Sequence, residues 1–573
     1  MVDICFKTST ENNLKMQKIT QISNGEISEY KLELEFDENE LPSEYKVCWE
    51  ESQIDTMGFW YPNNNFDPNI TANWWKREVR SDICHNMPLA SLYNKRGENR
   101  LTIALSDPKN PTKIRAGVVE ENGKIEYEIL FFSEKVAKMD KYEAIIRIDR
   151  RRIPFYKAAE SVNDWWIELG FKPSYEPKDA SAPLYSAWYS FHQRTIPEEI
   201  IAECKEAKKY GMDTMIVDDG WQTDDNSRGY AYCGDWEVCT TKIPDMKDFV
   251  NKIHDLDMKF IIWFSVPYVG YYSKSFKRFE GKYLYNNKRM SAMVLDPRFK
   301  EVREFLVDKY VSFVNTYNID GLKLDFIDSF YLTEESSVEY DKMDTISLSD
   351  ATEKLLSEIS AKLKAINPEF LIEFRQSYTG PVISQFGNMF RVTDCPNDPL
   401  LNRVHSLSMR TTQSGAVHSD MMMWSKEDTN ESVMYQLLGT MFCVPQISVR
   451  FDGIADDHKV ILKNYLDFWR EHKETLLHGE IEMFDVQANY SRARSTKNGE
   501  RVSVLYQSAV EDVDSSLTTY LFNASGSDYI YLESENELSY ESYNLFGEKT
   551  GVGIIKVGIN KLPLEIGARI KIN

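Results

Sequence analysis

The chain has 573 residues, of which 42% are hydrophobic and 13% aromatic. This composition is typical of a globular protein with roughly two to four domains and an ample core. Its 90 acidic and 68 basic residues give a formal net charge of −22, which disfavours binding to nucleic acid or to an anionic membrane. The composition therefore favours an enzyme for neutral ligands, with no nucleic-acid partner and no membrane partner.

The N-terminal stretch Met-Val-Asp-Ile-Cys-Phe-Lys lacks the apolar segment of a signal peptide, and no apolar run reaches the length of a membrane span. The eight cysteines are scattered singly, and the closest pair, Cys233 and Cys239, does not have the spacing of a zinc site. We therefore expect a cytoplasmic protein with free thiols. His192, His405 and His418 lie on different predicted elements, so we expect no metal and no cofactor.

Residues 1–178 alternate polar and apolar side chains in short runs between turn-rich pieces, which predicts an antiparallel β-sandwich. The clearest runs are Tyr30–Phe36, Leu101–Leu105, Ile125–Phe132 and Glu143–Ile148. Two aromatic clusters, around Trp60 and around Trp74, can stack on a sugar ring, although aromatic residues are more often core fillers. The stretch from Asp164 to Pro183 is predicted to be a linker to the next domain.

From Leu184 the pattern changes to alternating strands and helices. Eight apolar runs predict strands at Tyr185–Phe191, Asp213–Asp218, Lys259–Val266, Gly321–Phe326, Phe370–Arg375, Asn388–Thr393, Val417–Trp424 and Pro445–Arg450. The amphipathic stretches between them predict helices, among them Pro197–Tyr210, Met246–Asp255, Phe299–Tyr317, Leu348–Ile366 and Glu431–Phe442. Eight such units predict a (β/α)8 TIM barrel over residues 179–480. A doubly wound open sheet is the rival fold, but the chain contains no Gly-x-Gly-x-x-Gly and no Walker sequence.

Charged residues and tryptophans gather where these strands end, which is where a TIM barrel carries its chemistry. Lys323 and Asp325 interrupt a buried strand at period two and therefore share one face. The other strands carry, at or near their ends, Asp218, Asp219, Trp221, Trp263, Glu373, Arg375, Arg391, Asp394, His418 and Asp420. Carboxylates, cations and tryptophans around one mouth suit a polar, ring-shaped, uncharged ligand, which is the chemistry of a sugar.

Cleavage of a glycosidic bond needs two carboxyl groups, one to attack or to activate water and one to protonate the leaving oxygen. We assign Asp325 as the nucleophile, because Lys323 beside it should keep the carboxylate ionised. For the acid/base we choose Asp394, which closes the sixth strand, over Asp398 in the following loop.

Asp218 and Asp219 precede a tight glycine turn, where adjacent carboxylates can accept hydrogen bonds from vicinal hydroxyls. We expect both to bind substrate rather than to take part in catalysis. The other predicted substrate-binding residues are Trp188, Trp221, Trp263, Lys323, Arg375, Arg391 and Asp398.

The motifs around these residues are specific as a set. They are the run from Tyr210 to Trp221, Gly234-Asp235-Trp236, Lys242-Ile243-Pro244, Met258-Lys259-Phe260 with Trp263, Lys323-Leu324-Asp325, Arg391-Val392-Thr393-Asp394, and, in the first domain, Met87–Leu92 and Glu98–Asp107. Together they resemble glycoside hydrolase family 36, the α-galactosidase and raffinose synthase superfamily. The resemblance extends from about residue 55 to residue 455.

The resemblance implies a β-sandwich at residues 1–178, a catalytic TIM barrel at residues 179–480 and a C-terminal antiparallel β-sandwich at residues 481–573. It also implies a retaining α-galactosidase-like hydrolase, with Asp325 in the place of the family's nucleophile and Asp394 in the acid/base segment. The substrate is expected to be an oligosaccharide or another glycoside. A homo-oligomer is compatible with the sequence.

Three departures from the family pattern lie beside the expected sugar. Leu324 replaces the usual tryptophan of the nucleophile motif, the turn Glu373–Tyr378 replaces a Cys/Ser/Gly-rich turn, and the segment Thr393–Pro399 differs in spacing from the usual double-aspartate run. These departures leave α-N-acetylgalactosaminidase activity and α-galactosyl transfer open as alternatives. Two readings from other classes also stay open: a Schiff-base aldolase or lyase that uses Lys323, and a sugar-binding protein without catalysis.

Overall fold

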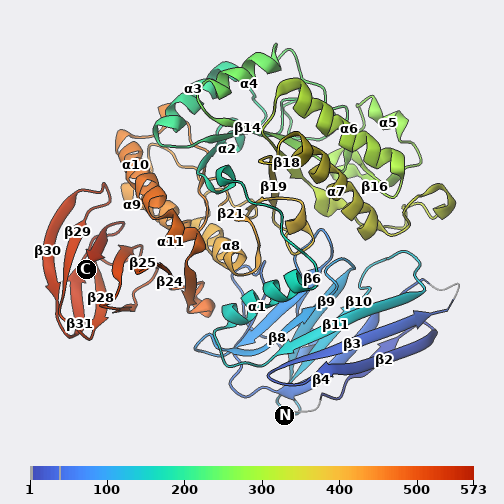
Figure 1. Ribbon diagram of the computed structural model, residues 1–573, viewed down its shortest axis with the longest axis horizontal. Coiled ribbons are helices and arrows are strands. Elements are labelled where there is room, and N and C mark those ends of the chain that lie inside the picture. Colours follow the sequence, from blue (N-terminus) through green and yellow to red (C-terminus); the bar gives the residue numbers. More distant parts are fainter. Residues whose placement is uncertain (1–3, 38–40) are drawn as a thin grey trace.

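The computed structural model describes residues 4–37 and 41–573. Figure 1 shows two sheet-rich domains beside a central barrel: the N-terminal sandwich in blue lies below the barrel, and the C-terminal strands in red lie to its left. The predicted fold class is confirmed. None of the helices among the described residues is both long and apolar enough to cross a membrane.

The N-terminal domain consists of two antiparallel sheets with the strand orders β1-β4-β10-β9-β6 and β2-β3-β11-β8-β7-β5. In β3 every second side chain is buried, because successive side chains of a strand point to opposite faces. The strands are β1 (Lys7–Thr10), β2 (Leu14–Ser23), β3 (Ile27–Phe36), β4 (Tyr45–Ser52), β5 (Gly58–Trp60), β6 (Arg77–Ser81), β7 (Leu89–Tyr93), β8 (Asn99–Leu105), β9 (Thr112–Val119), β10 (Lys124–Phe131) and β11 (Lys141–Asp149).

The predicted linker is wrong in its first part. Residues 155–168 form helix α1 (Phe155–Glu168), which buries Trp165 and Trp166. The helix packs on β7 and β8 of the sandwich and on helix α8 (Pro399–Thr412) of the barrel. The indole nitrogen of Trp166 donates to the carbonyl oxygen of Leu105 at 2.9 Å. The paired tryptophans therefore join the two domains through a packed helix.

The central sheet contains eight parallel strands in the order β21-β20-β19-β18-β14-β13-β12-β22. Single bridges, His418 with Val444 and Met422 with Ile447, join the two ends of this order and complete the ring. The eight strands are β12 (Leu184–Ser186), β13 (Thr214–Val217), β14 (Lys259–Ser265), β18 (Gly321–Asp325), β19 (Leu371–Arg375), β20 (Met389–Arg391), β21 (Ala416–His418) and β22 (Gln446–Ile447). All eight strands lie within predicted runs or start one residue before them.

Three of the predicted strands are much shorter in the structure. The run Tyr185–Phe191 ends as a strand at Ser186 and continues as helix α2 (Trp188–Phe191), because the hydroxyl of Ser448 accepts the backbone N–H groups of Tyr189 and Ser190. The last two runs retain only β21 and β22. Beyond these short strands the two runs stay paired through single backbone contacts, such as the Met422 N–H with the carbonyl oxygen of Gln446 and the Ser448 N–H with that of Met422.

The helices of the barrel follow the amphipathic stretches closely, and α7 has the predicted bounds. They are α3 (Pro197–Lys209), α4 (Met246–His254), α5 (Ser275–Arg278), α6 (Lys300–Tyr317), α7 (Leu348–Ile366), α8 (Pro399–Thr412), α9 (Asn430–Gly439), α10 (Asp456–Glu471) and α11 (Lys473–His478). A small antiparallel sheet, β15 (Tyr268–Gly270), β16 (Tyr283–Asn287) and β17 (Ala292–Leu295), is inserted after β14.

The C-terminal domain has a seven-stranded sheet and a three-stranded sheet, and its pairs are antiparallel apart from β25 with β27 and β26 with β28. Its strands are β23 (Glu480–Phe484), β24 (Arg492–Lys497), β25 (Glu500–Leu505), β26 (Val510–Val513), β27 (Thr518–Asn523), β28 (Tyr529–Ser534), β29 (Leu538–Tyr543), β30 (Lys549–Ile555), β31 (Gly558–Pro563) and β32 (Arg569–Ile572). We keep the domain boundaries after residues 178 and 480 as a proposal.

Candidate active site

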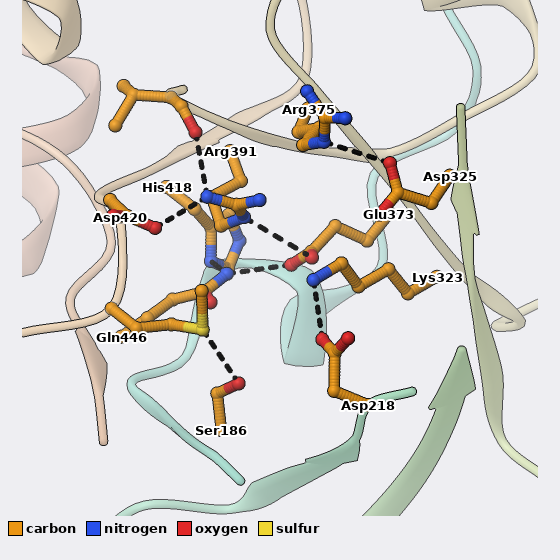
Figure 2. A network of polar contacts seen from close by, with 12 residues as sticks. Ser186, Asp218, Lys323, Asp325, Glu373, Arg375, Arg391, His418, Asp420 and Gln446 are labelled. Carbon is orange, nitrogen blue, oxygen red and sulfur yellow. Dashed lines mark hydrogen bonds and ion pairs between the residues drawn. The ribbon is translucent and has the colours of Figure 1, made fainter. Parts of the chain in front are cut away.

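The carboxyl end of β18 carries the centre of the site. Lys323 and Asp325 are both buried, and both side chains point from the strand toward the network of charged groups drawn in Figure 2. Neighbouring strands add Trp263 from β14 and Arg375 from β19, in the parallel register that aligns the strand ends of a barrel.

Asp325 accepts four hydrogen bonds. Its Oδ1 accepts from the Arg375 Nε and the Phe326 backbone N–H, each at 2.8 Å, and from the Tyr378 hydroxyl. Its Oδ2 accepts from the Trp263 indole nitrogen at 3.0 Å. Oδ2 therefore carries one donor where Oδ1 carries three, and it is the oxygen with free lone-pair capacity.

These contacts decide the protonation state of Asp325. Burial alone would raise its pKa, but Arg375 and Lys323, with the hydrogen bonds from Tyr378 and Trp263, outweigh burial and hold the pKa well below its usual range. Asp325 is therefore a carboxylate throughout the neutral and mildly acidic range.

Lys323 is also fixed in its charged form. Its Nζ donates to Asp218 Oδ2 at 2.5 Å. Burial would lower the pKa of this lysine, but Asp218, with Glu373 and Asp325, raises it above the ordinary value. A Schiff-base lysine needs a depressed pKa and a neutral amine, so this geometry does not favour the aldolase reading.

Asp219 lies beside Asp218 in a different environment. Its two oxygens accept from Gln193 Nε2 at 2.6 Å and Gln222 Nε2 at 2.7 Å. Burial raises the pKa of Asp219 to about 6, although both glutamines lower it in part. The adjacent aspartates are therefore not equivalent, because Asp218 has a lysine partner and Asp219 has neutral partners.

Arg391 of β20 connects the acid/base segment to the interior of the barrel. Its guanidinium donates to Asp420 and, at 2.8 Å, to Asp394, and it lies 3.9 Å from the carboxylate of Glu373 (Figure 2). Burial raises the pKa of Glu373 and of Asp420. Arg391 therefore faces three carboxyl groups.

The two candidate acid/base residues have different surroundings. Asp394 lies beyond the end of β20, with its side chain about half exposed. Burial of its carboxyl would raise its pKa, but Arg391, then Arg375 and Lys323, lower it. Asp398 accepts the backbone N–H of Leu401 at 2.9 Å and caps the N-terminus of α8.

Arg403, on the same helix, donates to Tyr435 and to the carbonyl oxygen of Asn489. The cap uses Oδ1 of Asp398 and one backbone N–H. The substrate contact predicted for Asp398 stays a prediction.

Of the three predicted tryptophans, Trp221 and Trp263 are fully buried, Trp263 with its indole nitrogen on Asp325, and Trp188 is partly exposed. Trp221 is fully buried against Trp236, Phe264 and Phe313, and its indole nitrogen donates to the carbonyl oxygen of Trp263. Its predicted sugar contact therefore does not fit the structure, and Trp221 packs the wall behind Trp263. Trp188 is partly exposed, and the guanidinium of Arg228 lies 5.4 Å from its ring centroid.

Histidines take hydrogen-bonding positions. His418 is fully buried and donates through Nε2 to the carbonyl oxygen of Ala180 at 2.7 Å, and burial lowers its pKa to about 4. In residues 4–37 and 41–573, no three His, Cys, Asp or Glu side chains form a group that could hold a metal ion.

Sequence reasoning missed Tyr378, Gln193 and Gln222. Tyr378 falls in the strand-five turn that departs from the family pattern, so the departure itself was a signal that this turn carries different contacts. Gln222 follows Asp219 by three residues, and Gln193 precedes it on the other side of helix α3. No sequence pattern distinguishes these two glutamines from surface residues.

Comparisons with known proteins agree with the family resemblance predicted from the sequence motifs. Residues 182–390 match the Melibiase family model. The bifunctional α-galactosidase/sucrose kinase AgaSK of Mediterraneibacter gnavus is 27% identical over 185 residues, which are 30% of this chain and 19% of that protein. The α-galactosidase Mel36A of Lactobacillus acidophilus is 30% identical over 175 residues, 29% of this chain and 23% of that protein. Each match thus covers about a fifth of the relative's length.

Solved structures resemble the chain over more of its length. The α-galactosidase of Lactobacillus brevis superposes with a TM-score of 0.65 at 12% identity, covering 100% of this chain and 84% of that one. The family 36 α-galactosidase AgaA of Geobacillus stearothermophilus, solved in complex with stachyose, gives 0.62 at 12% identity and covers 96% and 80%. The predicted resemblance is confirmed: residues 182–390 of the barrel match the Melibiase family model, and the chain has the fold of the glycoside hydrolase family 36 α-galactosidases.

Proposed function

We propose that this protein is a retaining α-galactosidase that cleaves terminal α-linked galactose by double displacement. The observation that carries the proposal is Asp325, a carboxylate held ionised at the carboxyl end of β18 inside a Melibiase domain. An ionised, buried and fixed carboxylate at this face is the group that a covalent nucleophile requires.

In the first step, Asp325 Oδ2 attacks the anomeric carbon while Asp394 protonates the departing oxygen. Trp263 and the donors on Oδ1 fix the attacking carboxylate. In the second step, Asp394 takes a proton from water, and the water displaces Asp325 from the sugar. Two inversions return galactose in the α configuration.

Asp394 must be protonated for the first step and ionised for the second. Arg391 favours the ionised form in the unoccupied protein. A neutral sugar that displaces water from the cleft removes solvation from the carboxylate, and this loss raises the pKa of Asp394 toward the acid form that the first step needs.

The substrate-binding role falls to Asp218, Asp219 and Lys323, which together offer two acceptors and a cationic donor to hydroxyl groups. The net charge of −22 also favours a neutral glycoside over an anionic one. The solved α-galactosidase complexes with stachyose and with p-nitrophenyl α-D-galactopyranoside support this substrate class. A cytoplasmic location and a homo-oligomer remain predictions from the sequence.

A panel of p-nitrophenyl α-glycosides tests the proposal, with NMR used to identify the anomer released first. The expected result is cleavage of the α-galactoside with α-galactose as the first product. Preference for the α-N-acetylgalactosaminide, transfer to added sugar in place of hydrolysis, or release of β-galactose would each refute one part of it. No cleavage of any glycoside would refute the enzymatic function.

A further inference from the structure

Gln376, the residue that follows β19, joins three distant parts of the chain. Its side chain is buried, and its Nε2 donates to Asn63 Oδ1 at 2.6 Å. Its Oε1 accepts the Thr393 backbone N–H at 2.9 Å and a hydrogen bond from His405 Nδ1 at 2.6 Å. Asn63 belongs to the N-terminal sandwich, whereas the other two partners belong to the barrel.

The ring of His405 extends the same connection. Burial lowers the pKa of His405 to about 4, so the ring is neutral near pH 7. Because Nδ1 donates to the oxygen of Gln376, Nε2 must act as an acceptor. Oδ1 of Asn65 lies 2.9 Å from Nε2, so a ring that donates through Nδ1 requires the Asn65 amide to be turned with its NH2 group toward Nε2. Two asparagines of one sandwich loop therefore bind the barrel through Gln376 and His405.

The barrel partners of this loop adjoin Asp394. Strand β20 ends at Arg391, so the backbone of Asp394 is outside the sheet ladder. The N–H of Thr393, one residue before it, is held by Gln376, and the N–H of Cys395, one residue after it, is held by Asp420 at 2.7 Å. These two bonds fix the chain on both sides of Asp394.

We propose that Asn63 and Asn65 of the N-terminal sandwich are positioning residues for the acid/base Asp394, and that they act through Gln376 and His405. The inference rests on the proposed function in that it gives Asp394 the acid/base role. Loss of the Asn63 acceptor leaves a buried N–H of Gln376 unpaired. Rotation of Gln376 to a new partner then releases the Thr393 N–H, and Asp394 loses the positional precision that proton transfer needs.

The test compares three variants in the same loop. Asn63→Ala removes the acceptor, and Asn63→Asp keeps it. Asn69→Ala is the matched control, since the side chain of Asn69 is exposed and donates to Asp67 of the same loop. Each variant is assayed with a galactoside whose phenolate leaves unaided and with an alkyl galactoside that needs the acid.

For Asn63→Ala, kcat/KM on the alkyl galactoside should fall about 10- to 100-fold relative to the activated substrate. Asn63→Asp should restore the ratio, and Asn69→Ala should leave it unchanged. An equal loss on both substrates, or no loss, would overturn the inference.

Hydrogen exchange read by mass spectrometry gives a result that does not depend on activity. The peptide that contains Thr393 and Cys395 should exchange faster in Asn63→Ala and at the wild-type rate in Asn69→Ala. Unchanged exchange in Asn63→Ala would overturn the positioning role even if the protein cleaved no galactoside. Faster exchange together with no cleavage of any galactoside by the wild type would instead refute the proposed function and leave the structural coupling in place.

Discussion

Asp219 gives a pH dependence that can be worked out from its surroundings. Burial raises its pKa to about 6, whereas an unfolded chain would have the ordinary value near 3.8. The folded protein therefore binds more protons than the unfolded chain between these two values, and this group lowers stability as the pH rises through that window. A shift of about 2 units corresponds to a destabilisation of about 3 kcal/mol, present above pH 6 and absent below pH 4.

The same shift predicts how sugar binding varies with pH. A hydrogen bond to an ionised acceptor contributes about 1 kcal/mol more than a bond to a neutral one. When Asp219 becomes protonated between pH 7 and pH 5, the Kd for galactose should rise about fivefold. Asp219→Asn replaces the carboxylate by a neutral amide, so at pH 7 this variant should bind galactose about as weakly as the wild type does at pH 5.

Titration calorimetry with galactose from pH 5 to pH 7.5 measures this effect without the chemical step. The matched control is Asp225→Asn in the following loop, whose carboxylate accepts hydrogen bonds from Ser227. It should retain the pH dependence of the wild type. A wild-type Kd that does not change with pH, or an unchanged pH dependence in Asp219→Asn, would contradict the role of ionised Asp219 as a hydrogen-bond acceptor for the sugar.

Two further predictions concern the catalytic carboxyl groups. Tyr378→Phe removes one of four donors that hold the Asp325 carboxylate and should lower kcat/KM about fivefold, which corresponds to about 1 kcal/mol, whereas Tyr272→Phe on the exposed surface should not. An unchanged kcat/KM in Tyr378→Phe would argue against a role for this hydrogen bond. Asp398→Ala removes a helix cap and should lower Tm, with a loss of about 1 kcal/mol in the free energy of unfolding and no change in the leaving-group dependence of kcat/KM. Asp394→Ala should still cleave activated aryl galactosides and should lose activity on alkyl galactosides. The reverse pattern would exchange the two assignments.

The barrel could be predicted because its strands and helices have strong local patterns. Helix α7 has the predicted bounds, and β18 differs from the prediction by one residue. The run Tyr185–Phe191 was misread because an apolar run does not show that Ser448, far along the chain, ends the strand at Ser186. The pair Trp165 and Trp166 was interpreted as linker because the Pro-containing run that follows it, up to Pro183, has the composition of a linker, whereas both residues lie near the end of helix α1.

The site was predictable at the strand ends and not beyond them. Lys323 and Asp325 follow from period two on a buried strand, since charges there need partners or a chemical role. Trp221 was misplaced because sequence cannot distinguish a tryptophan behind the site from one that faces it. The contact of Gln376 with Asn63 joins residues separated by more than 300 positions, and no local pattern encodes such a pair.

In the proposed mechanism, Asp325 attacks the sugar and becomes covalently attached to it. The most direct measurement is mass spectrometry of the protein incubated with a fluorinated α-galactosyl fluoride, whose ring fluorine slows the second step so that the intermediate accumulates. We expect one galactosyl adduct, on the peptide that contains Asp325, and none in Asp325→Asn. An adduct on another residue, or turnover of the reagent with undiminished activity in Asp325→Asn, would contradict it.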